Sequence, residues 1–204
     1  MRKCYSFSDS LKLPLVFFLF FFGNIFRLGE RYIVRGELSK VLLRPINSLF
    51  QICIEEVYLG DAGAFFVGCT LVGVALFKMK ISFTITRVII SLILLIVAVF
   101  IQLGFFLILT SLNFWFVGVQ GFQILILRNI NASRYPINIY HKIVQFIFTW
   151  VIPFAFIGYY PGLYVITGQL NHVMILSIIL ACILNLIGYR LWQAGSKRYN
   201  APGW

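Results

Sequence analysis

Six stretches of the chain carry long runs of apolar residues, and each is a candidate membrane span. They are Leu13–Phe26, Ala62–Phe77, Val88–Leu112, Asn113–Leu127, Ile143–Ile166 and Val173–Trp192. A spanning helix needs about 20 mostly apolar residues, because the hydrocarbon core is roughly 30 Å thick. Val88–Leu112 and Val173–Trp192 meet this requirement best, since neither contains an acidic or basic residue before Arg190. Leu13–Phe26 and Ala62–Phe77 are short and need help from their flanks or from a locally thinner bilayer.

Ile143–Ile166 differs from the other runs because Pro153 lies in its middle and Pro161 interrupts its second half. Proline removes a backbone donor and clashes with the preceding helical turn, so a straight helix is not expected here. Two structures remain open: one kinked span, or a re-entrant pair of half-helices with its hinge near Pro153. Hydrophobic periodicity does not decide between them.

The composition places most of the chain in lipid. Of the 204 residues, 61% are hydrophobic and only 11% are charged, whereas soluble domains have about 45–50% and about 25%. A water-soluble fold of this size cannot hide so many apolar side chains. The predicted fold class is therefore all-α, a polytopic transmembrane helix bundle with about five spans plus a re-entrant or proline-kinked segment. Residues 1–204 form a single domain.

The net charge of +11 does not indicate nucleic-acid binding. Basic residues flank membrane spans and set their orientation, and no Lys/Arg-rich stripe with interleaved aromatic residues is present. We expect no nucleic-acid partner. The C-terminal end carries Arg190, Lys197 and Arg198, and we place it in the cytoplasm together with the basic loop at residues 27–56. This topology puts eight of the 17 basic residues inside and nine outside, so charge alone does not choose it.

Candidate catalytic and metal-binding residues are missing from the sequence. The four cysteines are widely spaced, the two histidines do not share a helix face, and Glu55 and Glu56 point different ways on a helix. No Gly-rich loop ends in Lys-Ser or Lys-Thr, so the chain has no P-loop for a nucleotide. We predict no catalytic residue, no metal and no cofactor in this chain. Any ATP and Mg²⁺ belong to another polypeptide.

Polar groups inside the apolar runs are almost all amides. They are Gln102, Gln120, Gln123, Gln145 and Asn185, and we expect them to bond across helices at about 1 kcal/mol each. The absence of a central carboxylate or basic residue counts against a proton-coupled carrier or an ion channel. It favours a passage between packed helices for a large or apolar cargo. Close packing of the helices is assigned to four glycines, Gly68, Gly73, Gly118 and Gly121.

The loop at residues 27–56 contains a short amphipathic helix. Leu38, Val41 and Leu42 follow the i, i+3, i+4 spacing of one helix face. Gly36 marks the beginning, and Arg44 before Pro45 is a natural end, because proline disfavours helix in the residue before it. Composition alone leaves two roles open, a helix that lies on the lipid surface and a helix that docks into a soluble partner.

Residues 36–51, which read GELSKVLLRPINSLFQ, resemble the membrane subunit of bacterial type 2 ABC transporters, in a subfamily once classed as of unknown function. Ser39 stands where this family usually has Asp. Four later motifs agree in order and spacing: Phe114-Trp115, residues 134–140 (RYPINIY), residues 153–156 (PFAF) and residues 191–195 (LWQAG). The similarity covers roughly Phe20 to Gly203.

The resemblance implies a permease subunit of an ATP-driven exporter in the bacterial plasma (inner) membrane. Its partners would be cytoplasmic ABC ATPase subunits, a second permease subunit (the same or a different chain) and membrane lipid. Family members have six spans with cytoplasmic ends, so the resemblance also implies that a first span is missing before Met1. The alternative is a non-transporting membrane protein, either an assembly factor or a truncated permease remnant.

The resemblance also assigns roles to residues. The family's coupling helix corresponds to Gly36–Pro45, within the cytoplasmic loop at residues 27–56. The partner-binding residues would be Gly36, Glu37, Leu38, Leu42, Leu43, Arg44 and Pro45, with the three leucines as anchors and Glu37 and Arg44 as polar contacts. Residues 128–166 would form an interfacial and re-entrant region at the outer mouth, with hinge residues Pro153 and Pro161.

Overall fold

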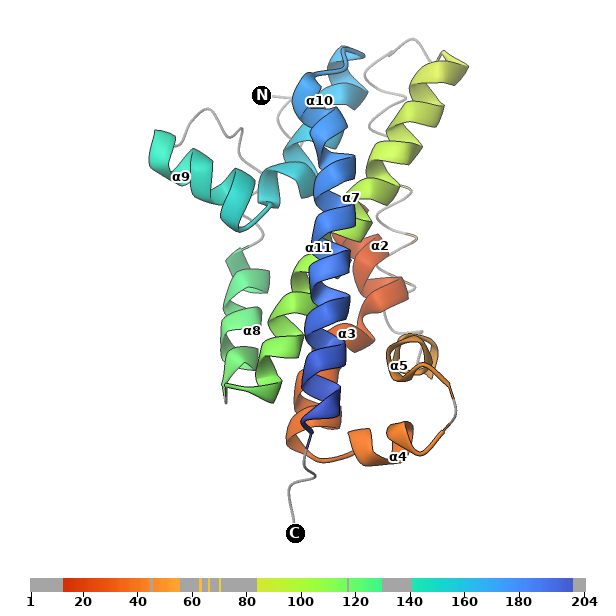
Figure 1. Ribbon diagram of the computed structural model, residues 1–204. Helices are drawn as coiled ribbons and strands as arrows, with labels where there is room; N and C mark the ends of the chain where they lie inside the picture. The colour runs from red at the N-terminus through yellow and green to blue at the C-terminus, as the bar shows by residue number, and fades with distance from the viewer. Residues whose placement is uncertain are drawn as a thin grey trace.

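The computed structural model describes residues 13–44, 46–55, 63, 66, 70, 84–116, 118–129 and 141–199, and within them it is helical and has no strand (Figure 1). The predicted all-α class is confirmed. In chain order the elements are α2 (Leu13–Phe22), α3 (Asn24–Arg27), η1 (Leu28–Val34), α4 (Leu38–Leu42), α5 (Ser48–Glu55), α7 (Ile85–Ser111), η2 (Leu112–Phe114), α8 (Val119–Asn129), α9 (Lys142–Phe146), η5 (Ile147–Val151), η6 (Ala155–Tyr159), α10 (Tyr160–Thr167) and α11 (His172–Lys197). Of the predicted run Ala62–Phe77, only residues 63, 66 and 70 are described, and these are helical.

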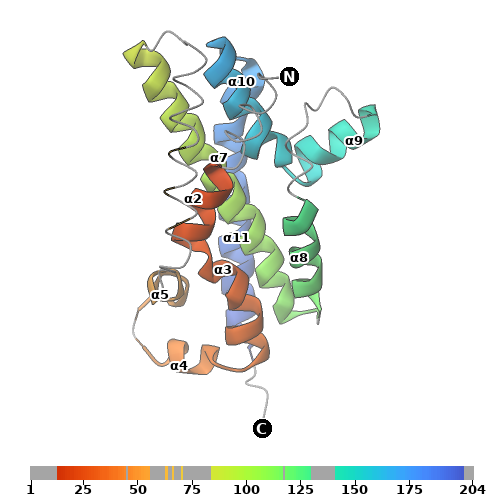
Figure 2. The ribbon, with the colours of Figure 1, turned by 180° about the vertical axis from the view of Figure 1, so that it is seen from behind.

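Two long apolar helices form the axis of the molecule. Ile85–Phe114, which is α7 continued by η2, has 30 residues, and α11 has 26, so each is long enough to cross a membrane. These match the two strongest spans expected from sequence. They run in the same direction, and α7 lies between α11 on one side and α2 and α3 on the other (Figures 1 and 2).

The close approach of α7 and α11 depends on glycines other than those expected. A Cβ atom added at Gly104 would lie 2.7 Å from the backbone nitrogen of Asn185, and one at Gly188 would lie 3.2 Å from the carbonyl oxygen of Gly104. The expectation for Gly118 and Gly121 was wrong for the described part of the chain, where nothing lies within 4 Å of a Cβ at either position. Gly68 and Gly73 lie outside the described residues. Glycine packing therefore joins the two longest helices.

The first helical run is longer than the sequence predicted. The run expected at Leu13–Phe26 continues through α3 and η1 to Val34, and Gly23 between α2 and α3 keeps helical angles (φ −56°, ψ −28°). Phe18 stacks on Phe106 of α7 with the ring centroids 5.5 Å apart. This run therefore packs along α7, and its end leads into α4.

The predicted span Asn113–Leu127 is divided in the structure. Asn113 caps the end of α7, where its Nδ2 donates to the carbonyl of Thr110 at 3.0 Å, and Gly118 has a positive φ of 92°, which glycine adopts without strain. α8 then turns back beside the last part of α7 (Figures 1 and 2). Its 11 residues measure only about 16 Å, which is roughly half of a hydrocarbon core.

The run Ile143–Ile166 is broken at Pro153, as the sequence indicated. Two helical arms, Lys142–Val151 and Ala155–Thr167, meet at 76°, because Ile152 is extended (φ −116°, ψ 96°). Pro161 lies at the beginning of α10, where the backbone stays helical, so the bend is at Pro153 alone. The second arm rests on the first turn of α7, since Nη2 of Arg87 donates to the carbonyl of Ile166 at 2.7 Å.

Candidate functional site

The amphipathic segment of the sequence forms α4 at one end of the molecule, which we call the α4 end (Figure 1). Gly36, with φ of 85°, makes the turn that leads from η1 into α4, a conformation that side chains with a Cβ rarely adopt. The turn is closed by the hydroxyl of Ser39, which donates to the carbonyl of Gly36 at 3.1 Å. The Nε of Arg31 binds Oε2 of Glu37 at 2.7 Å, so an ion pair ties η1 to the beginning of α4.

One face of α4 is buried within this chain. Leu38 is 0% exposed and Val41 is 4% exposed, and both pack with Tyr32 of η1, Ile52 of α5 and Trp192 of α11. Burying a leucine in this way contributes about 1.5–3 kcal/mol. α4 is therefore held firmly against the rest of the protein, although its five residues are too few for a stable isolated helix.

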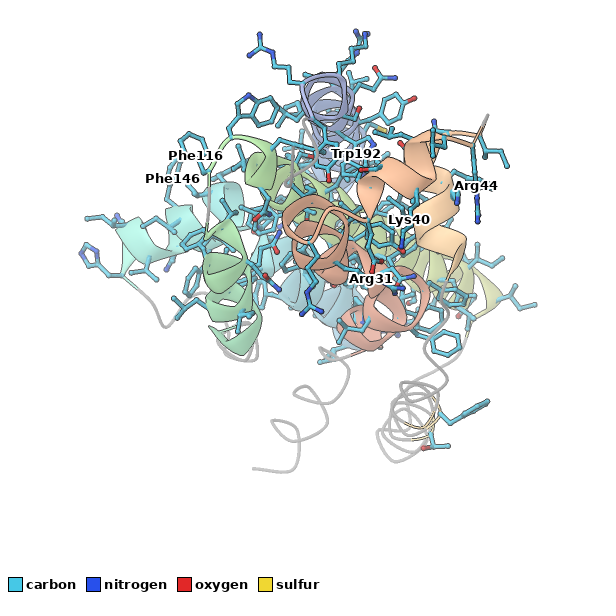
Figure 3. All side chains as sticks on the ribbon, turned by 90° about the horizontal axis from the view of Figure 1, so that it is seen from below. Arg31, Lys40, Arg44, Phe116, Phe146 and Trp192 are labelled. Atoms are coloured by element: carbon cyan, nitrogen blue, oxygen red, sulfur yellow. The ribbon has the colours of Figure 1, made fainter. Side chains whose placement is uncertain are left out.

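The end of α4 and the two residues that follow it are open. Lys40 and Arg44 are exposed, Leu42 is 44% exposed and Leu43 is 85% exposed. Figure 3, which looks onto the α4 end, places Arg44 at the outer edge of the molecule and Trp192 between α11 and the α4 segment. Two leucines beside two cations therefore form a small amphipathic surface that projects away from the bundle.

The structure separates the predicted partner-binding residues into two groups. Leu38 and Glu37 make contacts inside the chain, with the hydrophobic cluster and with Arg31, so the expectation of Leu38 as an anchor for a partner does not fit. Leu42, Leu43 and Arg44 are accessible. Gly36 shapes the turn, and Pro45 lies outside the described residues. Periodicity placed Leu38 and Leu42 on one apolar stripe, and only the fold tells which part of the stripe is covered.

Residues that sequence reasoning missed fasten α5 to other helices. Nδ2 of Asn24 donates to the carbonyl of Ile52 at 3.1 Å, and Nε1 of Trp192 donates to the hydroxyl of Ser48 at 3.3 Å. Asn47 accepts from the backbone N–H of Leu49 at 3.1 Å, as a helix-capping residue does. Asn47, shortly after Pro45, is a sequence signal that could have indicated where α5 begins.

Two interior amides bond across helices, and a third does not. Nε2 of Gln123 on α8 donates to the hydroxyl of Thr110 at 2.8 Å, and that hydroxyl donates to the carbonyl of Ile25 at 3.1 Å. Nδ2 of Asn185 on α11 donates to the carbonyl of Phe100 on α7 at 2.8 Å. Gln102 is 0% exposed, and neither atom of its amide finds a hydrogen-bond partner among the described residues. The expectation of cross-helix bonds therefore holds for Gln123 and Asn185, whereas Gln102 makes no such bond to the described helices.

In the part of the chain that the structure describes, no three His, Cys, Asp or Glu side chains lie close enough together to hold a metal ion. Cys182 is a free, exposed thiol on α11. The polar groups of the α4 end are an ion pair, capping groups and exposed cations, which are binding and positioning groups. This arrangement fits a surface for another protein better than a site for chemistry.

The fold and this surface define a helical membrane protein that presents a braced amphipathic helix at one end. Comparison with protein families then places the chain: the model for the ABC-2 family transporter proteins matches residues 5–203, so the chain belongs to that family. It is accordingly a membrane permease of an ABC transporter. No curated protein and no solved structure matches the chain significantly.

Proposed function

We propose that this chain, with a second permease subunit, forms the translocation path of an ATP-driven exporter in the bacterial inner membrane. In this proposal α4 is the coupling helix and binds a separate cytoplasmic ABC ATPase, which holds the ATP and Mg²⁺. The observation that carries the proposal is that Leu38 and Val41 of α4 are buried in their own chain, whereas Leu42 and the next residue, Leu43, are exposed. A coupling helix must be fixed to its own subunit and must leave side chains accessible to the ATPase.

The residues of α4 divide between these two tasks. Leu38, Val41 and the Arg31–Glu37 ion pair fix α4 to the permease. Leu42 and Leu43 enter a groove of the ATPase, and Arg44 adds a polar contact at its rim. Burying one such leucine stabilises a complex by about 1.5–3 kcal/mol, so two of them supply a substantial part of the binding free energy.

The arrangement of the ends supports a cytoplasmic position for α4. The C-terminal end of α11 lies at the α4 end (Figure 1), and it carries Arg190, Lys197 and Arg198, as cytoplasmic flanks of spans do. The bent pair of helices contacts the first turn of α7 through Arg87, at the opposite end. In this orientation the bent pair is the re-entrant structure at the outer mouth of the path.

The mechanism is a rigid-body movement. ATP brings two ATPase subunits together, each ATPase moves the coupling helix that it holds, and the two permease subunits tilt so that the passage between them changes. The interior amides carry no charge, so the passage suits a large or apolar cargo better than an ion.

The test is binding of candidate ABC ATPase subunits from the same organism to the purified chain in nanodiscs. Leu43→Asp removes about 2 kcal/mol of apolar contact and adds a charge to the groove, so the dissociation constant rises by about 30-fold or more. Phe116→Asp is the matched control, because Phe116 is another exposed apolar residue at the α4 end (62% against 85% for Leu43), on the side away from Arg44 (Figure 3). Equal binding by parent and Leu43→Asp contradicts the coupling role of α4, and absence of binding by the parent contradicts the proposed function.

A further inference from the structure

Four aromatic residues from four parts of the chain meet against the buried face of α4. They are Tyr32 of η1, Phe114 of η2, Trp192 of α11, and Tyr199 just beyond α11, and we call them the aromatic base. The ring centroids of Phe114 and Trp192 lie 5.2 Å apart, and those of Phe114 and Tyr199 lie 6.1 Å apart. Leu38 and Val41 of α4 pack in the same cluster.

Hydrogen bonds fasten the aromatic base to both segments that flank α4. On the far side of α4, the indole Nε1 of Trp192 donates to the hydroxyl of Ser48 in the first turn of α5 at 3.3 Å. On the near side, the hydroxyl of Tyr199 donates to the backbone carbonyl of Tyr32 at 3.4 Å. The segment that presents α4 is therefore joined before α4 to Tyr199, just beyond α11, and after α4 to Trp192 of α11.

The aromatic base also lies where the two long helices end. Phe114 ends the 30-residue helix that begins at Ile85, and Trp192 belongs to the last two turns of α11. The ring of Phe114 lies so close to Gly195 that any Cβ atom there would overlap it. Because packed interiors are dense and little compressible, a displacement of α4 is passed through the hydrophobic cluster that Leu38 and Val41 share with Phe114 and Trp192.

We propose that the aromatic base transmits the movement of α4 to α7 and α11 together, and that Trp192 is its central positioning residue. The inference rests on the proposed function, since it names the route that force takes after an ATPase has bound to α4. The first helical run precedes α4 in the chain and is one route by which α4 can move the bundle. Phe114 and Trp192 of the aromatic base provide a second route, which leads to α7 and α11 without passing along that run. The two long helices then move as one unit, because Gly104 and Gly188 hold them in close contact.

The experiment follows α11 with a probe on Cys182, which is exposed and lies ten residues, or about 15 Å of helix, from Trp192. Cys4, Cys53 and Cys69 are replaced by alanine, Cys182 carries an environment-sensitive fluorophore, and the complex with its ATPase is placed in nanodiscs. ATP with vanadate then traps the closed ATPase pair. We expect a shift in probe emission in the parent and its loss in Trp192→Leu. The control is Trp150→Leu, because Trp150 is an exposed tryptophan on η5, far from the aromatic base in the chain.

ATPase binding and the melting temperature are measured on every variant, which distinguishes the two proposals. Loss of the shift in Trp192→Leu with ATPase binding intact supports the inference, because a merely structural role would lower both the shift and ATPase binding. A full shift in folded Trp192→Leu, or no shift in a parent that binds the ATPase, overturns the inference and leaves the proposed function standing. A parent that binds no ATPase overturns both.

Tyr199→Phe keeps the proposal testable where Trp192→Leu does not fold. This variant retains the ring against Phe114 and removes only the hydrogen bond to Tyr32. A reduced shift in Tyr199→Phe with normal ATPase binding supports the inference, and an unchanged shift contradicts it.

Discussion

Gly104→Ala tests the contact on which the two long helices depend. The added Cβ would lie 2.7 Å from the backbone nitrogen of Asn185 and 2.8 Å from the carbonyl carbon of Leu184, whereas carbon atoms pack at about 3.5–4.0 Å. Both atoms belong to the backbone of α11, so no side-chain rotation relieves the overlap. The two helices must separate by about 1 Å, or one of them must bend.

The expected cost follows from three contributions. Overpacking a dense interior costs about 1–3 kcal/mol, and the separation weakens the 2.8 Å bond from Asn185 to the carbonyl of Phe100, which is worth about 0.6 kcal/mol in a membrane protein. Alanine returns about 0.5–1 kcal/mol, because it loses less conformational entropy in a helix than glycine does. We therefore expect Gly104→Ala to lower the free energy of unfolding by about 1–3 kcal/mol.

The assay is reversible unfolding by sodium dodecyl sulfate in mixed micelles, and Gly121→Ala is the matched control. Gly121 is also helical, but no described residue lies within 4 Å of its added Cβ, so this substitution should leave stability unchanged or raise it by up to about 1 kcal/mol. The reasoning is refuted if Gly104→Ala is as stable as the parent, or if both variants lose stability equally.

Two further predictions concern single side chains. Gln102→Leu should raise the free energy of unfolding by about 1–2 kcal/mol, because it removes a buried amide that bonds to nothing among the described residues. Gln123→Leu should lower the free energy of unfolding by about 1 kcal/mol, because it removes the bond to Thr110. A destabilised Gln102→Leu in the same unfolding assay contradicts the first prediction. Leu38→Asp should cost several kcal/mol and prevent recovery of folded protein, since it buries a carboxylate, whereas Leu43→Asp should stay within about 0.5 kcal/mol of the parent. Detergent-solubilised yield and melting temperature measure this difference, and equal behaviour of the two aspartate variants refutes it.

The long spans could be predicted from sequence because their signal is composition. Val88–Leu112 and Val173–Trp192 are apolar on all sides, and a helix is the structure that satisfies their backbone in lipid. Pro153 was equally informative, because proline excludes a regular helix on covalent grounds. The prediction of Asn113–Leu127 as a single span was wrong. It relied on apolar composition and gave too little weight to two local signals, the capping Asn113 and Gly118.

The glycines that pack α7 against α11 and the exposure of Leu42 could not be predicted, because both depend on which helix packs against these residues. Gly104 and Gly121 each precede a phenylalanine inside a predicted span, yet among the described residues only the first faces another backbone. Leu38 and Leu42 share an apolar stripe, and the position of Trp192 decides that the first is covered. A single sequence does not contain these distances between helices.

The bonds that complete the support of α4 set an order for biogenesis. Asn47 and Ser48 bond to Tyr189 and Trp192, which follow them by 142 and 144 residues. At a synthesis rate of about 5–20 residues per second, the ribosome needs roughly 7–30 seconds to bridge that interval. Until then the α4 segment lacks two of the hydrogen bonds that support it. Under the proposed function, the surface for the ATPase is therefore complete only after α11 has been synthesised.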